Sequence, residues 1–216
     1  MNIRRVIFLG PPGSGKGTQA EKLAKRMHVP HINVGGILRK EMSQKTTVGN
    51  TIAEYMKAGN LVPEEIAVNI TCSRLSDIDS SEGFILDGYP RTIYQAEALE
   101  KAGTTVDVVF LLDVSSDVIV DRMSGRRCCP ECGATYHTRC HPSVMGNNCE
   151  ICNVRLIQRA DDNPLTVMNR LDIYHEKTAP LIDFYNERGI LYRIAGEQDS
   201  ESIFSGICAL LKFDNP

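Results

Sequence analysis

The sequence of 216 residues lacks long apolar runs, an excess of basic charge, internal repeats and low-complexity tracts. Its longest apolar runs, residues 6–9 and 108–112, are far shorter than the roughly 18 residues that span a bilayer, which excludes a transmembrane helix. The run after Arg4 and Arg5 is also too short for a signal peptide, so we expect a cytoplasmic protein. The formal net charge of -3 gives no overall attraction to nucleic acid or anionic lipid, so neither is expected as a partner.

The composition, with 42% hydrophobic and 24% charged residues, is that of an ordinary globular protein of one or two domains. Short runs rich in Val, Ile and Phe alternate with segments of helical period, of which Ala20, Leu23, Ala24 and Met27 form the first apolar face. This alternation predicts an α/β fold: a parallel β-sheet core flanked by helices on both faces. The clearest predicted strands are residues 4–9, 84–86, 106–112 and 190–194.

Two segments interrupt this alternation and divide the chain. Residues 33–62 predict short helices, with Gly59 ending the second, and residues 126–163 are rich in Cys, Gly and Pro without a long apolar period. Helix is expected to resume at Pro164 after an Asn163 cap, and Pro180 is expected to kink or break it near Thr178. The predicted core therefore comprises residues 1–32, 63–125 and 164–216.

A glycine-rich loop follows the first predicted strand and opens the first helix, as a phosphate-binding P-loop does. Its backbone N–H groups and Lys16 can surround a phosphate, whereas the plain alternative is a turn that only joins strand to helix. Gly17 stands where a Ser or Thr is usual, so a hydroxyl ligand for Mg²⁺ has to come from Thr18 or be replaced by water. The residues proposed for this loop are Gly10, Gly13, Ser14, Gly15, Lys16, Gly17 and Thr18.

A carboxylate and a guanidinium side chain follow the buried run of residues 84–86. Asp87 can face the P-loop and hold a hydrated Mg²⁺, and Arg91 can clamp a phosphate with its planar guanidinium. The alternatives are a turn Asp before Gly88 and a solvated surface Arg.

Four of the eight cysteines form two pairs with metal-binding spacing. Two C-x₂-C pairs, separated by 16 residues, match the spacing of a four-cysteine zinc ribbon, which predicts a structural Zn²⁺ in a segment too small for its own core. The alternatives to zinc are two disulfides, unligated thiols or iron. Cys128 is a rival donor next to Cys129. Cys72 and Cys208 are expected to be small core residues. The predicted ligands are Cys129, Cys132, Cys149 and Cys152.

The sequence resembles the adenylate kinase family of nucleoside monophosphate kinases, in its long-lid, zinc-containing bacterial form. The resemblance rests on GPPGSGKGTQA, GFILDGYPRTIYQAEAL, DRMSGRR and the RADD of residues 159–162. It implies reversible phosphoryl transfer from ATP to AMP, giving two ADP, with Mg²⁺. It also implies an AMP-binding domain at residues 33–62 and a lid at residues 126–163. Nothing in the sequence requires more than a monomer, which is the state we expect.

The resemblance carries roles to individual residues. Lys16 would grip ATP phosphates, Arg122 would stack on the ATP adenine, and Gln95 would read the acceptor base, while Asp161 and Asp162 would orient lid arginines. A metaphosphate-like transition state needs positioning and charge neutralisation, so no catalytic base is expected. The implied catalytic residues are Lys16, Asp87, Arg91, Arg126, Arg159 and Arg170. ATP would be bound by the P-loop residues together with Arg122 and Arg126. AMP would be bound by Val34, Arg39, Val62, Gly88, Arg91, Gln95, Arg159 and Arg170.

One segment departs from the family. Where the family has Thr-Gly-Asp, this chain has Val34, Gly35 and Gly36, so two polar side chains are missing. A lost neutral hydrogen bond is worth about 0.5 to 1.5 kcal/mol, and a lost carboxylate near Mg²⁺ leaves its waters less ordered. We therefore expect lower activity or a relaxed acceptor choice, with UMP or CMP as candidates. The alternatives are a pyrimidine monophosphate kinase and, in another class, a P-loop NTPase switch that uses its zinc ribbon to bind a partner.

Overall fold

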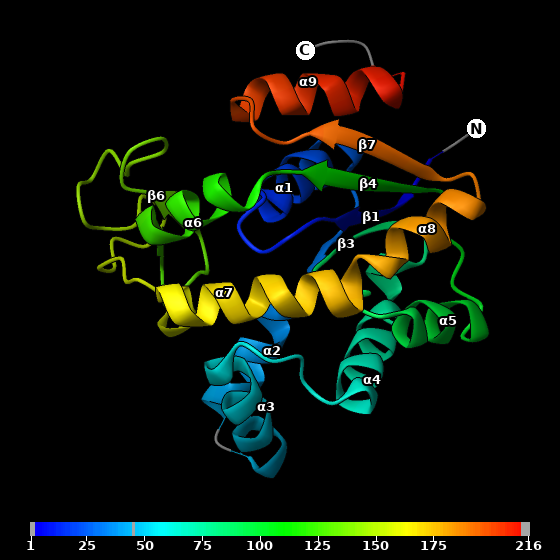
Figure 1. The fold of residues 1–216 in the computed structure, drawn as a ribbon, viewed down its shortest axis with the longest axis horizontal. Helices are drawn as coiled ribbons and strands as arrows, with labels where there is room; N and C mark the ends of the chain where they lie inside the picture. Colours follow the sequence, from blue (N-terminus) through cyan, green and yellow to red (C-terminus); the bar gives the residue numbers. More distant parts are fainter. Residues whose placement is uncertain (1–2, 45, 213–216) are drawn as a thin grey trace.

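The computed structural model describes residues 3–44 and 46–212, and its centre is a five-stranded parallel sheet (Figure 1). The strand order is β2-β3-β1-β4-β7, so the first strand of the chain lies in the middle. The predicted parallel sheet is thus confirmed, with strand ends that differ from the prediction by one or two residues. The strands are β1 (Arg5–Leu9), β2 (His31–Asn33), β3 (Phe84–Asp87), β4 (Val108–Asp113) and β7 (Leu191–Ala195).

Helices cover both faces of the sheet. On one face α1 (Lys16–Met27) and α9 (Ser200–Leu210) pack on Phe8 and Phe110, which are almost fully buried. On the other face Ile7 and Leu86 pack in a second cluster with residues of α4 (Glu64–Leu75), α5 (Ile93–Lys101) and α8 (Pro180–Glu187). Each such side chain contributes roughly 1.5 to 3 kcal/mol by leaving water, so the sheet is the stable frame of the molecule.

A pair of short helices occupies the first predicted insertion. These are α2 (Val34–Ser43) and α3 (Thr47–Ala58), which pack against each other below the sheet in Figure 1. Gly59 ends α3 in the left-handed conformation with φ of 79°, which confirms the helix end predicted at this glycine.

The second insertion is a small lobe between α6 (Ser116–Gly125) and α7 (Pro164–Ile173) (Figure 1). Strand β5 (Arg126–Cys128) pairs antiparallel with β6 (Thr135–His137), and a short helical turn, η2 (Ala160–Asp162), leads out of the lobe. Its buried cluster is small and holds Cys129, Tyr136 and Cys149.

The long helical region after this lobe begins and breaks where the sequence predicts. The Asn163 side chain accepts a hydrogen bond from the Thr166 backbone N–H at 3.0 Å, and Pro164 is the first residue of α7. A π-helical turn, η3 (Tyr174–Thr178), and the start of α8 at Pro180 interrupt the helix, because proline cannot donate the regular bond. Both predictions are confirmed.

Three short strands and the partial exposure of Cys72 were not predicted from the sequence. Strands β2, β5 and β6 have three residues each, too few to show an apolar period. Cys72 is only half-buried rather than a core residue, whereas Cys208 is fully buried.

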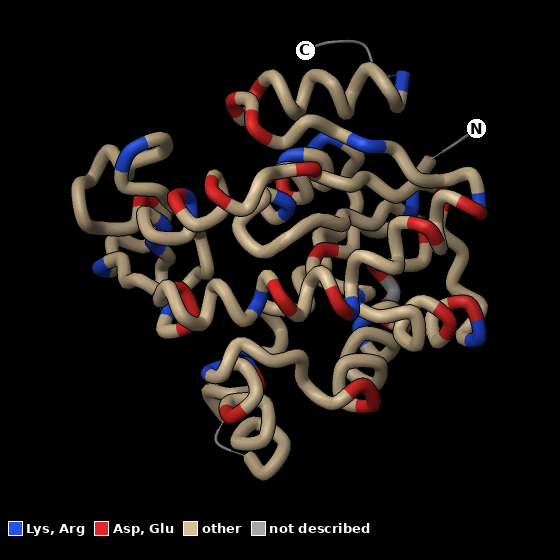
Figure 2. Tube along the Cα trace, in the orientation of Figure 1, with Lys and Arg blue, Asp and Glu red and all other residues tan. Residues whose placement is uncertain are grey.

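Charge and hydropathy of the folded chain agree with the composition. Among the described helices, none has the length and apolar character needed to cross a bilayer. Figure 2 shows basic and acidic positions interspersed along the trace rather than separated on different parts of it.

Candidate active site

The loop between β1 and α1 holds the Lys16 ammonium inside its own turn. Gly15, the residue before α1, has φ of 94°, a left-handed conformation that favours glycine. Lys16 Nζ donates hydrogen bonds of 2.7 Å to the carbonyl oxygens of Gly10 and Pro11, and lies 3.4 Å from Ser14 Oγ. Desolvation is the main cause that lowers the pKa of Lys16 to about 7, although Asp87 opposes the shift. An anionic ligand in this loop would restore the charge on Lys16.

Asp87, the last residue of β3, lies next to this loop. The β1–β3 register pairs it with Phe8, and it is buried, with His31 Nε2 at 3.5 Å from its Oδ2. A Cβ atom on Gly17 would come within 3.1 Å of the same Oδ2, so the glycine leaves room for the carboxylate. Desolvation opposes ionisation, but His31 and the charge of Lys16 outweigh it and keep the pKa of Asp87 below its usual value. An ionised carboxylate beside a phosphate loop fits a hydrated Mg²⁺.

Arg91 is fixed by its neighbours just beyond β3. Its Nε donates to the Gly88 carbonyl at 2.9 Å, and its backbone N–H donates to Gln95 Oε1 at 2.8 Å. Thr178 Oγ1 donates to the Arg91 carbonyl at 2.8 Å. Desolvation lowers the pKa of Arg91, while Asp87 opposes this, so the guanidinium is a charge that a phosphate can neutralise.

Two arginines, one at the start of the lobe and one on α7, are paired with the two adjacent aspartates of η2. Arg126 makes a two-bond ion pair with the fully buried Asp162 carboxylate, with Nε donating at 2.7 Å. Arg170 Nη1 donates to Asp161 Oδ2 at 2.8 Å, and desolvation lowers the pKa of Arg170 to about 10. Arg159 Nε is buried and has no hydrogen-bond partner among the described residues.

These cations converge from three parts of the chain. The charges of Arg91, Arg170 and Arg126 all act on Lys16 and lower its pKa, so all three lie near enough to influence it. Arg39 on α2 belongs to the same group: desolvation and then the charge of Arg159 lower its pKa to about 10. So many cations with few counter-charges form a site for a highly anionic ligand such as a polyphosphate.

The remaining predicted nucleotide residues form several local groups. Beside the P-loop, Arg122 Nη1 donates to the Ser14 carbonyl at 3.3 Å, and Thr18 is exposed. An open cavity of about 320 Å³ is lined by residues 60–64, which include the buried Val62, and by Thr92. Val34 is buried in the core cluster and Gln95 is buried beside Arg91. The roles expected of these residues toward nucleotides stay predictions.

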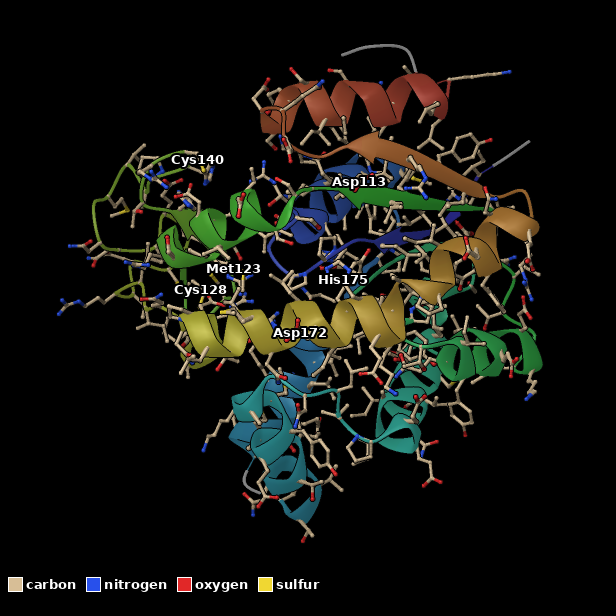
Figure 3. The ribbon with its side chains drawn as sticks, viewed as in Figure 1. Asp113, Met123, Cys128, Cys140, Asp172 and His175 are labelled. Carbon is tan, nitrogen blue, oxygen red and sulfur yellow. The ribbon has the colours of Figure 1, made fainter. Side chains whose placement is uncertain are left out.

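The four predicted metal ligands form one cluster. The sulfurs of Cys129, Cys132, Cys149 and Cys152 all lie within 4.8 Å of one another, and no other group of this kind occurs within residues 3–44 and 46–212. The Cys129–Cys152 and Cys132–Cys149 Sγ distances are 3.2 and 3.5 Å, close to the edge of about 3.8 Å for a tetrahedron with Zn–S bonds of about 2.3 Å. The rival Cys128 and the exposed Cys140 are outside the cluster and lie apart from each other in Figure 3. The set fits a closed, structural Zn²⁺ site.

Three residues that support these sites were not predicted. His31 lies beside Asp87, Thr178 holds the Arg91 backbone, and the Tyr136 hydroxyl contacts Cys149. Their contacts join residues distant in sequence, so no local motif indicates them. The one available signal is the placement of Thr178 directly before the predicted helix break.

Comparison with known proteins agrees with this geometry. The chain matches the model of the adenylate kinase family over residues 8–190. It is 46% identical over 204 residues to an adenylate kinase of Clostridium kluyveri, covering 93% of this chain and 94% of that protein. It is 44% identical over 211 residues to one of Lachnospira eligens, covering 96% and 99%. For one of Clostridium perfringens the identity is 42% over 214 residues, covering 97% and 99%. The chain therefore belongs to the adenylate kinase family.

Proposed function

We propose that the protein catalyses reversible transfer of the γ-phosphoryl group of ATP to AMP, giving two ADP. The observation that carries this proposal is the convergence of Lys16, Arg91, Arg126 and Arg170 beside the ionised Asp87. Phosphoryl transfer through a loose transition state requires charge neutralisation and alignment more than covalent help from the protein. An enzyme of this kind needs cations on both sides of the transferred group, and the arginines near Lys16 support the proposal that they supply them.

The residues divide the work by position. Lys16 and the P-loop N–H groups bind the donor phosphates, and Arg91 with Arg39 binds the acceptor phosphate. Arg126, Arg159 and Arg170 neutralise the charge on the group in transit, and Asp161 and Asp162 keep the arginines in place. The acceptor oxygen of a monophosphate is already ionised, so no side chain has to remove a proton.

Mg²⁺ would bind through water to Asp87 and neutralise charge on the donor phosphates. Residues 33–62 would form the acceptor domain, and residues 126–163 a lid held by a structural Zn²⁺ on Cys129, Cys132, Cys149 and Cys152. A closed lid excludes water that would otherwise divert transfer into hydrolysis. We further propose that the enzyme acts as a monomer in the cytoplasm.

The acceptor assay tests this function directly. Purified protein is incubated with Mg·ATP alone and with AMP, UMP or CMP, and nucleotide products and inorganic phosphate are quantified. We expect ADP in amounts that follow added AMP, and inhibition by diadenosine pentaphosphate, which joins both nucleotides. Phosphate release without an acceptor would instead indicate an NTPase, and preference for UMP or CMP a pyrimidine kinase. The adenylate kinase relatives do not favour either alternative.

A further inference from the structure

The phenol of Tyr136 contacts the cysteine cluster from outside the four sulfurs. Tyr136 lies on β6, and its hydroxyl oxygen is 3.4 Å from Cys149 Sγ. The same oxygen accepts a hydrogen bond from the Glu150 backbone N–H at 3.0 Å. Tyr136 is 5% exposed and Cys149 is 0% exposed, so this contact is shielded from water.

The chemistry of the partners fixes the direction of the contact. A cysteine that binds Zn²⁺ does so as a thiolate and has no proton to give. The Glu150 N–H can only donate, so it uses a lone pair of the hydroxyl oxygen. The phenolic hydrogen is therefore left to point at the Cys149 sulfur.

We propose that Tyr136 is a positioning residue of the metal centre, which orients Cys149 and draws negative charge from its thiolate. Partners that hydrogen-bond to ligands are known to orient them and to set metal affinity. The proposal rests on the zinc site proposed above. If the proposal holds, Cys149 is the ligand best protected from attack by an electrophile.

Two of the other three ligand residues are clearly more exposed than Cys149. Cys132 is exposed and Cys152 is half-buried, whereas Cys129 is 2% exposed. Among the described contacts, a phenolic hydrogen bond reaches Cys149 alone of the four ligands. An electrophile should thus attack Cys132 first and Cys149 last.

Tyr136 also connects the metal centre to a strand of the candidate active site. In the β5–β6 ladder Tyr136 is opposite Arg127, and the next residue, His137, is opposite Arg126. A Tyr136 side chain held by Cys149 therefore anchors the strand on which Arg126 begins the lobe.

The test replaces the hydroxyl and keeps the ring. Tyr136→Phe preserves the buried packing, and Tyr94→Phe, at a position 52% exposed on α5, is the matched control. Metal affinity is measured by competition with a chromophoric chelator for Zn²⁺. We expect Tyr136→Phe to weaken binding about 10- to 100-fold and the control to leave it unchanged.

Two further readouts separate this role from mere packing. With Co²⁺ in place of Zn²⁺, the sulfur-to-metal charge-transfer band of Tyr136→Phe should shift to lower energy, because the thiolate loses a donor. In the zinc-loaded wild type, alkylation mapped by mass spectrometry should modify Cys132 before Cys149, and Tyr136→Phe should speed alkylation of Cys149 several-fold without changing Cys132.

The outcomes are distinct. A wild type that gives no tetrathiolate Co²⁺ spectrum overturns the zinc site and this inference together. A wild type with that spectrum, but with unchanged affinity and charge-transfer energy in Tyr136→Phe, overturns the role of Tyr136 alone. Alkylation of Cys149 before Cys132 in the wild type contradicts it as well, even if the variant does not fold.

Discussion

The sheet core and the lobe of residues 126–163 are stabilised in different ways. The core buries two large apolar clusters, in which Ile7, Leu23, Ile85 and Leu86 are 0% exposed. The lobe buries little besides three cysteines and Tyr136, and leaves Ile151 73% exposed. A segment without enough apolar surface to fold by burial can fold around a metal instead, because the energy of metal binding becomes folding energy.

Removal of the metal should therefore unfold the lobe and leave the sheet core folded, and this is the largest effect we expect. Chelation should abolish the protection of backbone amides in the lobe against hydrogen exchange and leave β1 and β4 protected. Zinc binding to small zinc-finger peptides contributes about 10 to 16 kcal/mol, which is more than a lobe of this size gains from burial. Hydrogen exchange with mass spectrometry checks this, before and after Zn²⁺ is added back. Equal loss of protection in β4 would contradict the contrast.

A cavity in the core should destabilise the sheet core and leave the metal site of the lobe unchanged. Leu86→Ala removes a fully buried side chain from β3 and should lower the free energy of unfolding by about 2 to 5 kcal/mol. Zinc affinity should not change, because Leu86 belongs to the core cluster. Denaturant unfolding compares it with Leu165→Ala, a position 81% exposed, where we expect a change within about 0.5 kcal/mol. Equal destabilisation by both variants would contradict the core assignment.

The charged side chains of the core and of the other parts of the site should respond differently to pH. Between about pH 7 and 9 Lys16 of the core loses its proton, whereas the pKa values of Arg170 and Arg39, at about 10, keep those side chains charged. A bound polyphosphate raises the pKa of Lys16, so binding takes up a proton above pH 7. The dissociation constant for ATP should then increase by up to about tenfold per pH unit.

Isothermal titration calorimetry in buffers of different ionisation enthalpy measures this proton uptake. Lys16→Arg is the control, because arginine stays charged in this range and should remove the pH dependence. The same shift has a consequence for folding. Between about pH 7 and 10.5 the unfolded chain, with an ordinary lysine pKa of 10.5, binds more protons at this group than the folded one, so the free energy of unfolding rises with pH across this range. Binding of ATP without proton uptake would contradict the position of Lys16.

The smallest effect that we expect concerns Gly36 on α2. A Cβ atom on Gly36 would lie 3.4 Å from the Asn33 side chain, so an aspartate fits there. Gly36→Asp should raise turnover with AMP by up to about tenfold, because a second carboxylate would order waters around Mg²⁺. Gly206→Asp on α9, where a Cβ meets nothing within 4 Å, is the control. Unchanged or lower turnover in steady-state kinetics would refute the expectation drawn from Val34, Gly35 and Gly36.

The sequence predicts those parts of the molecule whose signals are local. The P-loop, the strand that ends at Asp87, the helix ends at Gly59 and Pro164 and the paired cysteines all follow from short patterns, and the structure has these elements in the expected places. Strand β2 was missed because three residues show no period. The contacts of His31 and Tyr136 depend on how distant strands and loops meet, which no spacing encodes.

The central claim is that donor and acceptor phosphates meet at one point among cations from three parts of the chain. A crystal structure with bound diadenosine pentaphosphate and Mg²⁺ tests it most directly. We predict a single phosphate chain that runs from Lys16 to Arg91, with Arg126 and Arg170 contacting its middle. Phosphates that contact Lys16 and Arg91 in two separate cavities would contradict the account.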